Sequence, residues 1–183
     1  VVADHAENLG LASLIEDSDP RLLENEWGKM VHDLAKSGKL GDAYSAWGAQ
    51  VTKKEDPLAD IEGLQTTMWQ HLTQIAEDHN SPGQFTALIG YEWTSTPGGA
   101  NLHRNVIFRD GKEKADTTNP MSVYDSEDPE DLWKWMSDYE QKSGGKVLAI
   151  PHGGNLSNGL MFDDVTFTSR EPLDADYAER RSR

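Results

Sequence analysis

In the first 80 residues of the chain, hydrophobic side chains recur every three or four positions, which is the spacing of an amphipathic helix. Asp19 followed by Pro20 is typical of a helix start, and Gly38 and Gly41 interrupt the pattern. The pattern predicts helices over residues 20–36, 42–53 and 57–79.

Shorter hydrophobic runs predict four strands. Residues 1–3 have the character of the end of a buried strand, and residues 85–89 that of a second one. A third run, residues 101–108, follows after a Pro-Gly-Gly turn at 97–99, and residues 146–150 form the last.

A further helix is predicted between the last two strands, beginning at Asp128 and Pro129. Trp133 and Trp135 cannot share one face of this helix, so we expect Trp135 in the core and Trp133 partly exposed, where it could serve self-association. Residues 175–183 are polar and show no core-forming pattern.

The order of strand, helices, strand, strand, helix and strand predicts an α/β fold with a largely parallel sheet. We interpret residues 1–183 as one domain. The helical run at about residues 11–80 is too long for a simple crossover, and it is expected to be an insertion or lid after the first strand.

Composition limits the class of partner. The chain has 32 acidic and 17 basic residues and a net charge of -15, which disfavours nucleic acid and anionic membranes as partners. A small anionic substrate stays possible because a metal ion reverses the local field. Six tryptophans argue against a disordered acidic chain. Oligomeric state is not indicated.

There is no cysteine, so any metal site must use histidine, carboxylate and water. The lack of cysteine favours an exported or periplasmic protein over a cytoplasmic one without deciding the compartment. No hydrophobic run is long enough to span a membrane and no signal peptide is visible. The first residues already have strand character, so we expect a segment of a longer protein.

Potential metal ligands follow three of the predicted strands. Asp4 and His5 follow the first, Glu92 the second and His152 the last, while His103 lies on the strand beside Glu92. Side chains at the carboxyl ends of parallel strands converge, so we expect these residues to meet. Imidazole and carboxylate suit zinc, manganese or iron, and Asp4 could be a ligand or an outer-shell group.

Two kinds of alternative stay open for these residues. Residues 85–108 could be an ordinary hairpin with a solvated Glu92 and a hydrogen-bonded core histidine at His103. His152 could simply bond to backbone, and Asp4-His5 could begin a loop. No GxGxxG, P-loop, GxSxG or HExxH motif is present, which removes the usual nucleotide-binding, serine hydrolase and zincin interpretations.

Further polar residues near these positions could hold the anionic oxygens of a substrate. We predict Arg104 as an anion clamp that assists catalysis. The predicted substrate-binding amides are Asn101, Asn105, Asn155 and Asn158.

Four motifs carry a resemblance to a known family: DHAENLG from Asp4, GYEWTS from Gly90, NLHRNV from Asn101 and IPHGGNLSNG from Ile150. The chain resembles a bacterial family of unknown function, number 3604 in its series. That family is similar to the PHP (polymerase and histidinol phosphatase) superfamily of metal-dependent hydrolases.

The resemblance implies a distorted seven-stranded β/α barrel with two or three divalent metal ions at its carboxyl end. His5, His103 and His152 would be ligands and Glu92 the carboxylate that bridges metals. The superfamily also has an N-terminal His-x-His and a C-terminal Asp-x-His pair, and this sequence has neither. The resemblance therefore implies that the N- and C-terminal parts of the barrel are missing here and that this segment alone is inactive. Gly154 stands where asparagine is more usual, which leaves no side chain for a role there.

The leading hypothesis is a metal-dependent hydrolase of a phosphoester or related anionic ester that uses metal-activated water. The alternative is a noncatalytic ligand-binding module on a barrel that has lost its metals. A His-x-His upstream of Val1 would favour the enzyme.

Overall fold

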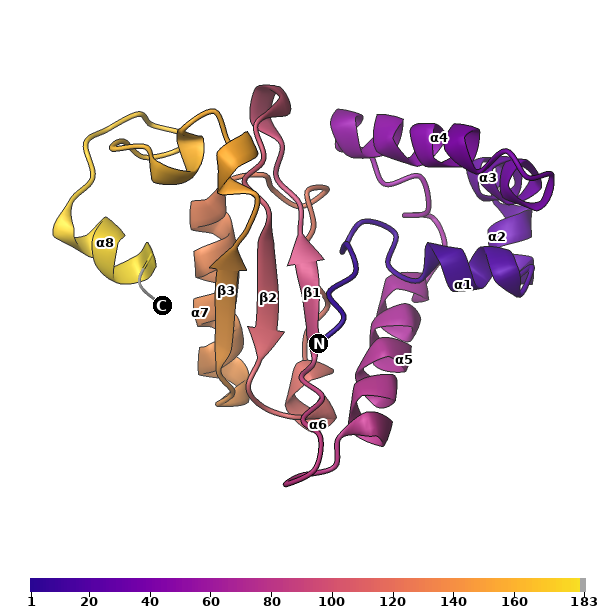
Figure 1. The fold of residues 1–183 in the computed structure, drawn as a ribbon, viewed down its shortest axis with the longest axis horizontal. Coiled ribbons are helices and arrows are strands. Elements are labelled where there is room, and N and C mark those ends of the chain that lie inside the picture. The colour runs from indigo at the N-terminus through magenta and orange to yellow at the C-terminus, as the bar shows by residue number, and fades with distance from the viewer. Residues whose placement is uncertain (182–183) are drawn as a thin grey trace.

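The computed structural model describes residues 1–181, and its fold is mixed α/β (Figure 1). Within that range there are eight α-helices, three short 3-10 helices and one three-stranded sheet. The helices are α1 (Leu11–Glu16), α2 (Pro20–Glu24), α3 (Glu26–Lys36), α4 (Leu40–Lys53), α5 (Leu64–His79), α6 (Lys112–Ala115), α7 (Pro129–Ser143) and α8 (Ala175–Arg181). The 3-10 helices are η1 (Pro97–Gly99), η2 (Gly154–Leu156) and η3 (Leu160–Phe162).

Helices α1 to α4, residues 11–53, form a helical lobe that extends away from the sheet (Figure 1). The helix predicted over residues 20–36 is two helices, because Asn25 is extended and its side chain caps α3 at the N–H of Gly28. Gly28 also allows the close approach of α2, since a Cβ there would lie 2.4 Å from the backbone oxygen of Leu22.

Of two other predicted helix starts, one is wrong and one is correct. The helix expected from residue 57 begins at Leu64, because the Asp56 carboxylate accepts the N–H of Leu58 and holds a turn there. The start at Asp128-Pro129 is confirmed: the Asp128 carboxylate accepts the N–H of Glu130 at 2.8 Å.

The sheet consists of β1 (Gly90–Trp93), β2 (Arg104–Phe108) and β3 (Val147–Pro151), in that order. Both pairings are antiparallel, so the predicted largely parallel sheet is wrong. The connection between β1 and β2, residues 94–103, turns tightly at η1 and is too short to carry a crossover. β1 and β2 therefore form a hairpin.

The first two predicted strands are also misplaced. Residues 85–89 lie outside regular strands, and the polar segment after them forms β1. Val1 and Val2 are 53% and 84% exposed and do not end a buried strand. The segment after them does lie beside β1, where His5 pairs with Glu92 in parallel orientation.

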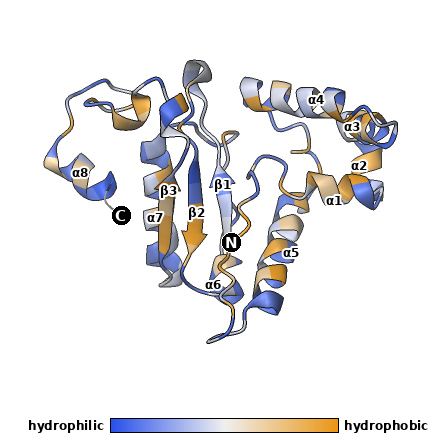
Figure 2. Ribbon diagram, viewed as in Figure 1, coloured by the Kyte–Doolittle hydropathy of each residue, from blue (hydrophilic) through white to orange (hydrophobic). Residues whose placement is uncertain are grey.

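One face of the sheet is buried against α7, and α5 packs beside β1 (Figures 1 and 2). Phe108 of β2 is fully buried and lies edge-on to the ring of Tyr139 at 5.1 Å. The indole of Trp69 in α5 is buried and donates to the backbone oxygen of Ala115. This layer of aromatic side chains fixes the strands that carry the candidate site.

The expectations for Trp133 and for the end of the chain were both wrong, because the two pack against each other. Trp133 is 7% exposed, because Tyr177 of α8 packs edge-on against it with 5.2 Å between ring centroids. Residues 175–181 thus form a helix with one core side chain, and Trp133 is not a free surface for self-association. The closed barrel implied by the family resemblance stays a prediction, since the described sheet has three strands.

Candidate metal centre

Four of the five predicted ligands, His5, Glu92, His103 and His152, meet at one end of the sheet although the strands are not parallel. Glu92 is near the carboxyl end of β1, and His152 directly follows β3, which runs in the same direction. His103 directly precedes β2, which runs in the opposite direction, so it reaches the same end. His5 arrives from the segment that pairs in parallel with β1.

Alternation along the strands places these side chains on one face. Glu92 is opposite Asn105, and Asn105 is opposite Ile150, so the three share a face. His103 and His152 lie two positions from Asn105 and Ile150, and the N–H of His152 donates to the backbone oxygen of His103 at 3.2 Å. The face opposite α7 therefore carries the whole cluster.

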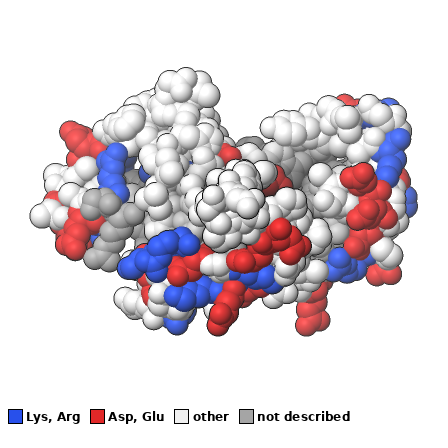
Figure 3. Space-filling model, turned by 60° about the horizontal axis from the view of Figure 1, so that its bottom comes forward, with Lys and Arg blue, Asp and Glu red and all other residues white. Residues whose placement is uncertain are grey.

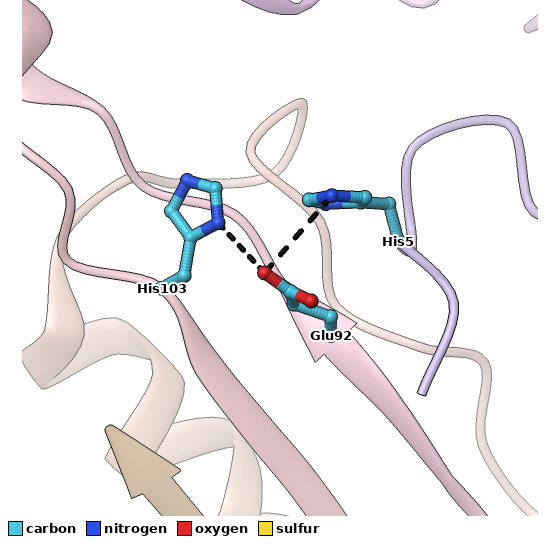
Figure 4. A group of neighbouring side chains, drawn as sticks. All are labelled: His5, Glu92 and His103. Carbon is cyan, nitrogen blue, oxygen red and sulfur yellow. Dashed lines mark hydrogen bonds and ion pairs between the residues drawn. The ribbon is translucent and has the colours of Figure 1, made fainter. Parts of the chain in front are cut away.

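One oxygen of Glu92 is the centre of the cluster (Figure 4). Its Oε1 lies 2.7 Å from Nδ1 of His103 and 2.7 Å from Nε2 of His152. Nε2 of His5 lies 4.0 Å from the same oxygen. His5, Glu92 and His103 each offer a ligand atom within 4.8 Å of the others, which is close enough to hold one cation.

The carboxyl group of Glu92 is held in its ionised form. Burial by itself would raise its pKa, but hydrogen bonding to His103, the charge of His5 and hydrogen bonding to His152 outweigh burial and lower the pKa to about 2. An ionised carboxylate surrounded by imidazoles is the state that a divalent cation needs.

Two residues that we did not predict, Thr94 and Glu7, hold His5 through hydrogen bonds on the Nδ1 side of its ring. Nδ1 of His5 lies 2.8 Å from Oγ1 of Thr94, and that hydroxyl donates to Oε2 of Glu7 at 2.5 Å. The other oxygen of Glu7 accepts the N–H of Val123 at 2.7 Å. The period of two in an extended chain could have indicated Thr94, which lies two positions after Glu92. It could not have indicated Glu7, because that residue lies in a turn.

Asp4 is not brought into the cluster. Its side chain is exposed, and Oδ1 accepts the backbone N–H of His5 at 3.0 Å. Its contribution is through the backbone, because its carbonyl accepts the N–H of Glu92 at 2.8 Å. Asp4 thereby fixes the register of the two segments that carry His5 and Glu92.

Arg104 lies on the opposite face of the sheet from the cluster. It is 6% exposed, its guanidinium donates to the backbone oxygen of Leu102 at 2.7 Å, and it lies over the ring of Trp93 at 5.7 Å. Burial lowers its pKa to about 10. The alternation of β2 explains the placement, since Arg104 is adjacent to Asn105 and must point the other way. The structure therefore does not place it as an anion clamp at Glu92.

The predicted substrate-binding amides divide into two groups. Asn105 shares the cluster face, and Asn101 organises the approach to His103 by accepting its backbone N–H at 3.1 Å. Asn155 and Asn158 are exposed in the loop after β3, on and just beyond η2. Of the four amides, Asn105 shares the sheet face of the cluster and Asn101 contacts one of its histidines.

The family assignment rests on a match over the full length, since a family model matches residues 1–183. The chain belongs to the family described as Protein of unknown function (DUF3604). Comparisons with curated proteins and with solved structures found no significant match. The DUF3604 description assigns no activity, so the chemistry has to be argued from the side chains.

Two features of the surface bear on partners of this DUF3604 chain. None of the helices in residues 1–181 has the length and hydropathy needed to cross a membrane. On the face drawn in Figure 3, lysine and arginine side chains are interspersed with aspartate and glutamate. That face therefore presents no extended basic footprint.

Proposed function

We propose that this protein is a metal-dependent hydrolase of a phosphoester or a related anionic ester. The observation that carries the proposal is the convergence on Oε1 of Glu92. Two imidazole nitrogens lie 2.7 Å from this oxygen and a third lies 4.0 Å away, each from a different segment of the chain.

The donor set fits a divalent ion such as zinc, manganese or iron. Three imidazoles and one carboxylate are ligands for these metals, and the carboxylate is able to bridge two of them. His5, Glu92 and His103 would hold one ion, and His152 extends the set through Nε2, which lies 2.7 Å from Oε1 of Glu92. A bound ion would lower the pKa of water and stabilise negative charge on the ester.

The chain's own polar groups would orient these ligands and the substrate. Thr96 Oγ1 lies 3.3 Å from Nε2 of His103, and Asn101 holds the backbone of the same residue. Asn105 shares the sheet face with Glu92 and is the amide best placed to donate to an anionic oxygen.

The barrel architecture of the PHP superfamily is part of the same proposal. The sheet face that carries Glu92 also carries Leu148 and Ile150, which are 49% and 43% exposed. Hydrophobic side chains in this position are expected in the interior of a barrel. The competing proposal is a noncatalytic binding module that has lost its metals, which the metal analysis below distinguishes.

Metal content tests the proposal directly. The purified protein would be incubated with zinc, manganese or iron(II), desalted, and measured by inductively coupled plasma mass spectrometry. We expect at least one ion per chain, and its loss in Glu92→Gln and in His103→Ala. His71→Ala is the matched control, because His71 is an exposed histidine on α5 outside the cluster.

Release of phosphate from an aryl phosphate by the metal-loaded protein tests the reaction itself. Undiminished metal in both cluster variants would overturn the metal centre. Bound metal without hydrolysis of any phosphoester or related ester would overturn the enzyme proposal. A protein that binds no metal would favour the noncatalytic module.

A further inference from the structure

A hydrophobic cavity opens beside the candidate metal centre. It has a volume of about 320 Å³ and lies between the segment that carries His5 and the helical lobe. His5 belongs both to the wall of this cavity and to the cluster, so the cavity lies next to the cluster. The hydrophobic part of the wall consists of Leu11, Ile15, Val31, Leu40, Tyr44 and Trp47.

Two aromatic rings of α4 form one side of the cavity next to His5. The ring of Trp47 lies 5.6 Å from the His5 ring and 5.5 Å from that of Tyr44. The indole N–H of Trp47 donates to the backbone oxygen of Glu7 at 3.3 Å, which fixes the indole against the segment that carries His5. The rings are therefore held beside the cluster.

Neither ring belongs to the hydrophobic core. Helix α4 has no buried residue, and Tyr44 is 70% exposed. Trp47 is half-buried. Aromatic rings that flank a cavity provide flat hydrophobic surfaces, on which other flat rings stack with an offset or edge-on geometry. The placement points to a flat ring as the occupant.

We propose that the cavity binds the aryl group of an aryl phosphate ester whose phosphate lies at the cluster around Glu92. This proposal rests on the proposed function, because it extends the same site. In the reaction, the bond between phosphorus and the aryl oxygen breaks, a bond from the water oxygen to phosphorus forms, and a water proton passes to the aryl oxygen. The products are a phenol and inorganic phosphate.

Binding of phenol to the metal-free protein tests the cavity without any need for metal or activity. In a titration followed by the 15N-1H signal of the Trp47 indole, phenol should shift the signal and bind at least five times more tightly than cyclohexanol. Trp47→Ala should weaken phenol binding at least fivefold. Because this variant lacks the indole signal, its binding is measured by saturation-transfer NMR on the ligand. Trp47→Phe, which keeps a flat ring, should restore most of it and shows that α4 is still folded.

Phe85→Ala is the matched control, since Phe85 is an exposed aromatic residue, 61% accessible, that lines a different cavity. Equal binding of phenol and cyclohexanol, or equal losses in Trp47→Ala and Phe85→Ala, would overturn the proposal and indicate a nonspecific hydrophobic surface. If hydrolysis fails but phenol binding follows the expected pattern, the cavity stands and the proposed function falls.

In the metal-loaded protein, the loss of the Trp47 ring should affect the KM for an aryl phosphate more than the KM for an alkyl phosphate. Trp47→Ala should raise KM for phenyl phosphate about tenfold and change KM for methyl phosphate less than twofold. A change of equal size for both esters would contradict a role in binding the aryl group.

Discussion

At the scale of single residues, the hydrogen bonds behind His5 decide which of its nitrogens can bind a cation. Burial raises the pKa of Glu7 above its ordinary value, and hydrogen bonds from Thr94 and Val123 offset this only in part. While Glu7 is ionised it can only accept, so the Thr94 hydroxyl donates to Glu7 and the hydroxyl oxygen accepts a hydrogen bond from the Nδ1–H of His5. Nε2 then keeps a free lone pair on the side of Glu92.

Replacing Glu7 with glutamine should reverse this arrangement. The new amide donates to Thr94, the Thr94 hydroxyl then donates to Nδ1 of His5, and the proton of the ring moves to Nε2. We expect imidazole 15N shifts of the metal-free protein to show the changed tautomer, and metal affinity to fall by about 10- to 100-fold. Thr94→Ser should keep both properties of the wild-type protein. An unchanged tautomer in Glu7→Gln would show that the relay does not orient His5.

The low pKa of Glu92 predicts how stability depends on pH. The pKa is about 2 in the folded protein against an ordinary value of 4.5, so folding favours the ionised form. The stabilisation is fully present above pH 4.5 and is lost as pH falls towards 2. Its upper limit is about 3 kcal/mol, because one pKa unit corresponds to roughly 1.4 kcal/mol.

The measurement is urea unfolding of metal-free protein at several pH values, for the wild type and for Glu92→Gln. The free energies of unfolding should differ most above pH 4.5 and converge as pH falls towards 2. A difference that does not depend on pH would mean that the ionised form of Glu92 is not favoured by folding.

At the scale of secondary-structure elements, two helical glycines differ in what surrounds them. A Cβ on Gly28 of α3 would lie 2.4 Å from the backbone oxygen of Leu22, whereas a Cβ on Gly48 of α4 would meet nothing within 4 Å. Gly28→Ala should therefore destabilise by more than about 1 kcal/mol, because α2 has to move away. Gly48→Ala should stabilise by up to about 1 kcal/mol, because alanine favours the helix. Thermal unfolding measures both; equal effects in the two variants would contradict the close packing of α2 on α3.

The elements also show what could be predicted from the sequence. The start of α7 was correct because its signal is local: Asp128 caps the helix and Pro129 follows. The break at Asn25 was missed, because hydrophobic spacing continues across it and shows neither the Asn25 cap nor the close approach of α2 at Gly28. The position of β1 was missed as well, since Tyr91 and Trp93 are buried by α5 and α7, which local hydropathy does not show.

The candidate site was predicted better than the fold around it. Glu92, His103 and His152 meet as expected although the sheet is antiparallel. The hairpin places the end of β1 beside the start of β2, and β3 runs in the same direction as β1, so its end lies there too. The face of each side chain was not predicted, and this explains why Arg104 was wrongly expected beside Glu92. The period of two in a strand would have placed Arg104 on the opposite face once the bounds of β2 were known.

At the scale of the whole molecule, the net charge of -15 has a consequence for stability. A large excess of one sign of charge destabilises the compact state through repulsion, and salt screens this repulsion. Several of the surface ion pairs are exposed, such as Lys134 with Asp138 at 73% and 42% side-chain exposure. Such exposed pairs are screened by solvent, contribute little to stability and do not offset the repulsion.

We therefore expect the Tm of the metal-free protein to rise by several degrees when NaCl is increased from about 10 mM to about 300 mM, over which the screening length falls severalfold. Differential scanning calorimetry in the presence of a chelator measures this, because the chelator removes any stabilisation by cations bound at Glu92. KCl is the control, since screening depends on ionic strength and not on the identity of the monovalent ion. A fall in Tm with salt would mean that attractive ion pairs outweigh the repulsion among the 32 acidic residues. Without the chelator, the same repulsion predicts that added divalent ions raise Tm further, and comparison with Glu92→Gln separates the part of this rise that comes from the metal centre.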